Sequence, residues 1–147
     1  MLREKTITLE DSGKQLTFKL RQMAATQLES WTFRLGLVLA AAGSDIPIDK
    51  GVEGAILYLA KHGFAALGKI SYENAKPLLD EMLGCCYRVV DRVEEKVTVE
   101  TADAYIENMM TLFRLRLEAF KVNFDFFDRG GKSDSQGDPN TIKLNAR

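Results

Sequence analysis

The side chains that could carry out chemistry are few in this sequence and poorly spaced for it. Cys85 and Cys86 are adjacent, so they could form only a strained disulfide with each other. Metal and redox sites need CxxC spacing or nearby histidines, and the only histidine, His62, lies in a mostly apolar stretch. We therefore expect two buried thiols, no metal site and no cofactor.

Paired carboxylates can perform acid–base catalysis, and they occur here as Asp80-Glu81 and Glu94-Glu95. Neighbouring residues on a helix point in different directions, so neither pair can form a site alone, and we interpret both as solvated surface. The phosphate-binding patterns GxxxxGK[ST] and GxGxxG do not occur. We predict that the chain is not an enzyme.

The candidate partner-binding residues are phenylalanines in the last apolar segment of the chain. They are Phe120, Phe124, Phe126 and Phe127. On a helix the last three point around much of the circumference, so a single buried face cannot hold them all. One interpretation is a core helix whose last turn packs under the N-terminal strands. The other is a hydrophobic docking patch for a partner.

Composition points to an ordinary globular domain. The chain has 147 residues, of which 46% are hydrophobic and 28% charged, with a formal net charge of −1. There is no basic excess of the kind that nucleic-acid binders carry. The longest apolar run, 35–43, is too short to span a membrane, and no signal-peptide core follows Met1. We expect a cytoplasmic protein with no nucleic-acid or membrane partner.

The N-terminal segment predicts a β-hairpin over about residues 5–21. Apolar residues alternate with polar ones on both sides of a short turn that contains Gly13. A two-stranded hairpin is marginally stable alone, so its apolar face needs cover from helices or a partner.

The next segment predicts a helix over about 26–42. Thr26 and Glu29 form a capping box, and Trp31 lies on the main apolar stripe, so we expect Trp31 in the core. Phe33 and Leu37 widen that stripe, which predicts burial of this helix on more than one side.

The remaining pattern completes a mainly α fold with an N-terminal β-hairpin (α+β), in which about four helices form a small bundle. Further helices are expected over about 52–67, 74–91 and 102–127, with an extended connection over 95–99. Residues 1–128 would form one globular domain. The tail, 129–147, has little apolar content and is expected to be disordered.

Several stretches resemble the tail assembly chaperones of tailed bacteriophages, most clearly over residues 6–42. The residues that carry this similarity are Ile7-Thr8-Leu9-Glu10-Asp11, Leu16-Thr17-Phe18-Lys19-Leu20-Arg21-Gln22-Met23, Ala25-Thr26, Glu29, Trp31 and Arg34. Relatives carry a proline after the methionine, where this chain has Ala24.

The resemblance implies a chaperone that binds the phage tape-measure protein, keeps it soluble and helps to recruit tail-tube subunits. It also implies action in the host-cell cytoplasm of a phage or prophage, absence from the mature virion, and in many relatives a frameshifted longer form. Self-association stays open. Two alternatives remain: a structural tail-completion or head–tail connector component, and a helical adaptor that binds a host protein.

Overall fold

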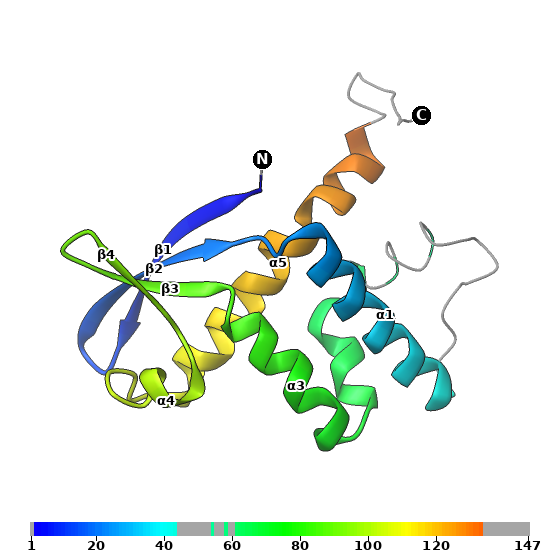
Figure 1. Cartoon of the computed structure of the whole chain (residues 1–147), viewed down its shortest axis with the longest axis horizontal. Coiled ribbons are helices and arrows are strands. Elements are labelled where there is room, and N and C mark those ends of the chain that lie inside the picture. Colours follow the sequence, from blue (N-terminus) through cyan, green and yellow to red (C-terminus); the bar gives the residue numbers. More distant parts are fainter. Residues whose placement is uncertain (1, 44–53, 55–57, 59–60, 134–147) are drawn as a thin grey trace.

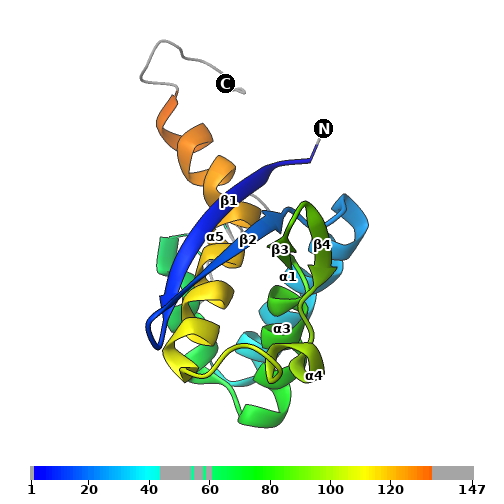
Figure 2. The same cartoon turned by 90° about the vertical axis from the view of Figure 1, so that its left-hand side faces the viewer.

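The computed structural model describes residues 2–43, 54, 58 and 61–133, and Figure 1 shows their arrangement. The side chains of residues 63–64 and 125–133 are not described. Four strands form one antiparallel sheet in the order β1-β2-β3-β4. Helices lie against one face of that sheet (Figure 2).

The predicted N-terminal hairpin is present. Strand β1 (Glu4–Asp11) pairs with β2 (Lys14–Arg21) along their whole lengths. The two-residue turn between them holds Ser12 at a φ of 50° and Gly13 at 89°. Two left-handed residues in succession make a turn whose twist matches that of the flanking strands. Glycine at the second position adopts this conformation without steric cost.

A second hairpin overturns the prediction of a helical bundle. The helix expected over 74–91 ends early, as α3 (Tyr72–Leu83), and the chain continues as β3 (Cys86–Val90) and β4 (Val93–Lys96). Strand β3 pairs with β2 around Lys19, where it supplies hydrogen-bond partners that a helix would leave unused. The fold is therefore a four-stranded sheet covered by helices.

The helices also differ from the prediction in their limits. Helix α1 (Ala25–Ala41) agrees with the expected 26–42, but its N-cap is Ala24 and no side chain caps it, so the predicted capping box of Thr26 and Glu29 is wrong. The helix expected over 52–67 lies mostly outside the described residues, and its described end is a 3-10 helix, η2 (Gly63–Lys69). The remaining elements are the short α4 (Val99–Ala102) and the long α5 (Met109–Ser133).

The prediction of one helix over 102–127 is wrong at both ends. Thr98 and Thr101 form a reciprocal cap on α4, and the chain turns before α5 begins at Met109. Helix α5 then continues to Ser133, five residues into the segment that we expected to be disordered. None of the helices in the described parts of the chain has the length and apolarity needed to cross a bilayer.

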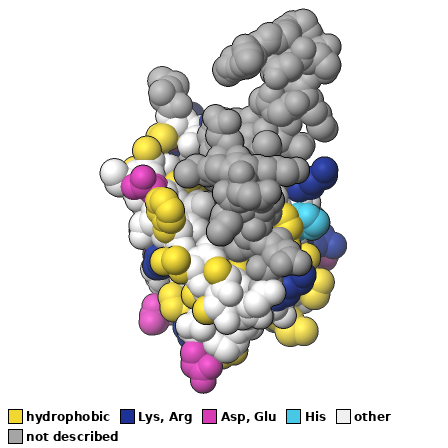
Figure 3. All heavy atoms as spheres, turned by 90° about the vertical axis from the view of Figure 1, so that its right-hand side faces the viewer, with side chains coloured by type: hydrophobic (Ala, Val, Ile, Leu, Met, Phe, Trp, Pro, Cys, Tyr) yellow, Lys and Arg dark blue, Asp and Glu magenta, His cyan; other side chains and the backbone are white. Residues whose placement is uncertain are grey.

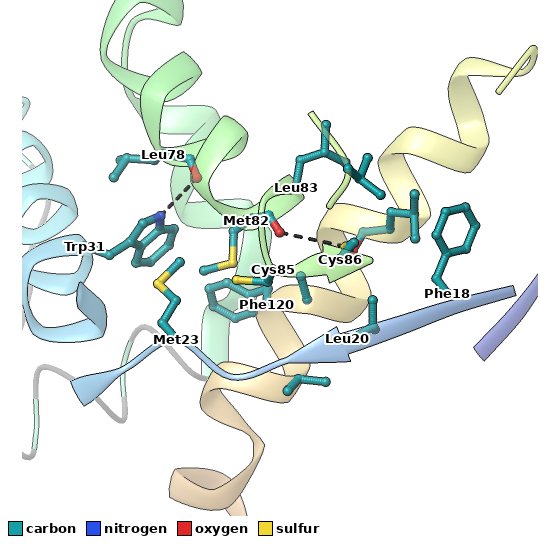
Figure 4. Packing of buried hydrophobic residues seen from close by; sticks show 14 of the residues in the cluster. Phe18, Leu20, Met23, Trp31, Leu78, Met82, Leu83, Cys85, Cys86 and Phe120 are labelled. Carbon is teal, nitrogen blue, oxygen red and sulfur yellow. Dashed lines mark hydrogen bonds between the residues drawn. The ribbon is translucent and has the colours of Figure 1, made fainter. Parts of the chain in front are cut away.

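The core lies between the sheet and the helices and includes Trp31, as expected (Figure 4). This side chain is fully buried, and its indole Nε1 donates a hydrogen bond to the carbonyl of Leu78 at 3.0 Å. Phe18 and Leu20 of β2 close the sheet side of the core. Full burial of the indole, with its N–H satisfied, makes Trp31 a major contributor to stability.

Candidate protein-binding surface

The candidate residues all belong to α5, which runs across the inner face of the sheet (Figure 2). Asp11, at the end of β1, fixes the start of this helix. Its carboxylate accepts hydrogen bonds from the backbone N–H groups of Glu107 at 2.9 Å and Asn108 at 3.0 Å, and from the Thr111 hydroxyl at 2.7 Å. These donors satisfy a fully buried charge.

The pKa of Asp11 reflects two opposing influences. Burial alone would raise the pKa of the carboxyl, but hydrogen bonds from Glu107, Thr111 and Asn108 outweigh burial and bring this pKa below its ordinary value. Asp11 therefore stays ionised and holds the first turn of α5 in place.

Asn123 fixes the middle of α5 to the connection between β2 and α1. Its fully buried side chain accepts a hydrogen bond from the Met23 backbone N–H at 2.8 Å and donates one to the Ala119 carbonyl at 2.9 Å. On the flanks of the helix, Lys5 pairs with Glu118 at 3.1 Å. The position of α5 is thus set at several points along its length.

Two of the four predicted partner-binding residues lie in the core. Phe120 is 3% exposed and Phe124 2% exposed. Their ring centroids lie 6.0 Å and 5.8 Å from that of Trp31. Helix α5 would have to leave the core before either ring could meet a partner, and their role in binding stays a prediction.

The other two predicted residues, Phe126 and Phe127, have side chains outside the described ones, and their role in binding also stays a prediction. Their backbone belongs to the last turns of α5, which project beyond the sheet and the other helices in both cartoon views (Figures 1 and 2). The structure therefore separates the four phenylalanines into a core pair and a pair on a projecting segment.

Exposed apolar side chains also occur on α1. Phe33 is 57% exposed and Leu37 69% exposed, one helical turn apart. The prediction that α1 is buried on more than one side is therefore wrong. Figure 3 shows hydrophobic side chains exposed on the side of the molecule where α1 lies. Neighbouring exposed apolar side chains are a candidate interaction surface.

A second exposed group, at the start of α5, was missed by sequence reasoning. Met109 is 78% exposed and Met110 49% exposed. Because one helix was expected from residue 102 onward, Met109 was assigned to its buried apolar stripe. The signal for the buried face is instead the row of Leu115, Ala119 and Val122, which share one side of the helix.

The residues considered for chemistry do not come together. Cys85 and Cys86 are buried, and burial raises the pKa of both thiols, which makes them poor nucleophiles. Glu81 forms two hydrogen bonds with the Arg34 guanidinium, at 2.5 and 2.8 Å, and so braces α3 against α1. Within the described residues, no group of histidine, cysteine and acidic side chains could hold a metal ion.

A recess lies between the start of α1, α3, α4 and the sheet, and most of the charged side chains that line it are paired. Arg21 binds Glu4 at 2.7 Å, and Lys76 binds Asp80 at 2.7 Å across one turn of α3. The recess has no strong excess of one charge to favour an ionic ligand. The exposed apolar side chains of α1 and α5 are the described features that favour contact with another protein.

Comparison with known proteins agrees with a role of this kind. A family model described as "Phage tail assembly chaperone protein, TAC" matches residues 14–134. This match covers β2, the second hairpin and all the described helices, including the whole of α5. No match was found among curated proteins. No solved structure matched the chain either.

Proposed function

Because the chain belongs to the phage tail assembly chaperone family, we propose that it binds the phage tape-measure protein, keeps it soluble and helps to recruit tail-tube subunits. The tape-measure protein is expected to be a long, amphipathic helical chain. Before the tail is assembled, the apolar side of such a chain is exposed to water and favours aggregation.

The observation that carries this proposal is the projection of α5. The core pair, Phe120 and Phe124, fixes α5 against Trp31, while the last turns of α5 project beyond the sheet and the other helices. Those turns carry Phe126 and Phe127 in the sequence. An anchored helix with aromatic residues beyond its anchor can pack against a client helix, because a few aromatic residues often dominate the binding energy of an interface.

Binding of one copy need not be strong. Many copies along one client would give high total affinity, since each further contact on the same assembly is effectively intramolecular. We expect charge to contribute little, because the chain has a formal net charge of −1.

The test is co-expression with the tape-measure protein of the same phage or prophage. The double variant Phe126→Ser/Phe127→Ser should keep the wild-type circular dichroism spectrum but leave the client in the insoluble fraction. A matched control is Val90→Ser/Val93→Ser, which removes two exposed apolar side chains from the second hairpin. The control should hold the client as the wild type does.

The outcomes discriminate between the surfaces of the chain. If the Phe126/Phe127 variant folds and still keeps the client soluble, the projecting segment is not the binding surface. Phe33→Ser/Leu37→Ser is the next variant to compare, because these side chains form the exposed apolar group on α1. If no variant and no wild-type protein co-purifies with the client, tape-measure binding itself is wrong.

Recruitment of tail-tube subunits is tested with the assembled complex. We expect the tube protein to bind the chaperone–tape-measure complex more tightly than it binds the tape-measure protein alone. We also expect mass spectrometry of purified particles to lack this chain. Its presence in particles would favour a structural tail component instead.

A further inference from the structure

The two edges of the sheet are built differently. Strand β4 has four residues, all of them exposed, and its sequence, Val93-Glu94-Glu95-Lys96, is largely charged. Short, charged edge strands discourage pairing with other chains. Strand β1 is twice as long, is paired along its whole length with β2, and contains no proline. Among the described residues, no strand pairs with its outer side (Figure 2).

The hydrogen-bond pattern identifies which groups this edge presents. The two-residue turn makes Asp11 and Lys14 a hydrogen-bonded pair, and alternation along the hairpin then directs the odd-numbered residues of β1 toward β2. The bond from the Gln22 N–H to the Arg3 carbonyl at 2.9 Å continues this pattern. Thr6, Thr8 and the other even-numbered residues therefore direct their N–H and C=O groups away from the sheet.

We propose that β1 pairs antiparallel with β1 of a second copy, so that two four-stranded sheets join into one across a two-fold axis at Thr8. The inner faces of both sheets lie on the same side only when even-numbered residues oppose even-numbered ones. The register centred on Thr8 places Thr6 opposite the second copy's Glu10, and Ile7 opposite its Leu9. A self-paired interface of this kind is closed and gives a dimer.

Charge selects this register over its neighbour. Centring the pairing on Thr8 places Glu10 opposite the uncharged Thr6 of the other strand. Centring it on Ile7 instead would place Glu4 directly opposite Glu10, and like charges in that position are destabilising. The chosen register also buries Ile7 and Leu9, which are only partly covered in the single chain.

The experiment is a charge exchange at the two-fold axis. Thr8 is exposed, and its side chain makes one contact, with the Thr17 hydroxyl at 3.3 Å, so substitution there should leave the fold intact. In Thr8→Lys two lysines would oppose each other across the axis, and in Thr8→Glu two glutamates would. Each variant alone should weaken the dimer at least several-fold by analytical ultracentrifugation, while an equimolar mixture should restore it.

The matched control is Thr17→Lys, which adds the same charge to the same face of the sheet but one strand inward. It should dimerise like the wild type. The proposal is wrong if the wild type stays monomeric at every concentration, if Thr8→Lys keeps the wild-type mass, or if the mixture fails to re-form the dimer. Unfolding of a Thr8 variant would show in its circular dichroism spectrum. In that case Thr6→Glu is used instead. It places a second glutamate opposite the second copy's Glu10 and should weaken the dimer, and adding Glu10→Lys to the same chain should restore it.

Discussion

At the scale of single residues, Asp11 links the hairpin to α5 through a buried charge. We predict that Asp11→Asn lowers the free energy of unfolding by about 1–3 kcal/mol at neutral pH, because an amide cannot accept all three hydrogen bonds and its NH2 group would face donors. Urea unfolding measures this change. A decrease in the free energy of unfolding of less than a few tenths of a kcal/mol would show that the hydrogen bonds of Asp11 contribute little.

The same carboxylate makes stability depend on pH. Since the pKa of Asp11 is lower in the folded chain than its ordinary value of about 3.9, its contribution is fully present above that value and is lost as the pH falls through the folded pKa. Between neutral pH and the acid range, the wild type should therefore lose more stability than Asp11→Asn. If both proteins lost the same stability on acidification, Asp11 would not be the source of this pH dependence.

At the scale of elements, the two hairpin turns have the same backbone form but different residues. The first has φ angles of 50° and 89° at Ser12 and Gly13, and the second has 50° and 70° at Asp91 and Arg92. Left-handed backbone costs a non-glycine residue roughly 1 kcal/mol. Arg92→Gly should therefore raise the melting temperature by a few degrees, whereas Gly13→Ala should lower it. A lower melting temperature for Arg92→Gly would mean that the arginine side chain outweighs its backbone cost.

This difference also explains what could be predicted about the sheet. Gly13 between two alternating segments is a clear signal for a hairpin, and the first hairpin is where the sequence placed it. The second turn lacks glycine and asparagine, and Glu94 and Glu95 favour helix as readily as strand. Only the pairing of β3 with β2, far away in the sequence, decides its conformation.

At the scale of the whole molecule, the apolar periodicity predicted which segments are buried but not which side of α5 faces the core. Trp31, Phe120 and Phe124 all lay on predicted stripes, and the structure packs them together. Whether Phe120 and Phe124 are buried depends on how closely α5 packs against α1, which no local pattern contains. The sequence also did not predict that α5 continues through its last turns, because Gly130 and Gly131 suggested that the helix had ended.

Residues 134–147 contain few apolar side chains. Among the side chains that the structure describes, the last member of the hydrophobic core along the sequence is Phe124. Deleting residues 134–147 should therefore leave the melting temperature within a few degrees of the wild type, as measured by differential scanning calorimetry. A larger fall would show that the tail contributes to the folded structure.

The attachment of the hairpin to α5 also governs when this protein can fold. The bonds from Thr111 to Asp11 and from Met23 to Asn123 each join residues that are 100 positions apart. On a ribosome the N-terminal strands emerge long before the helix that covers them, and closing so long a loop is slow. Until α5 has been synthesised, Phe18 and Leu20 have no cover from it, so a nascent chain of this chaperone is itself in need of protection from aggregation.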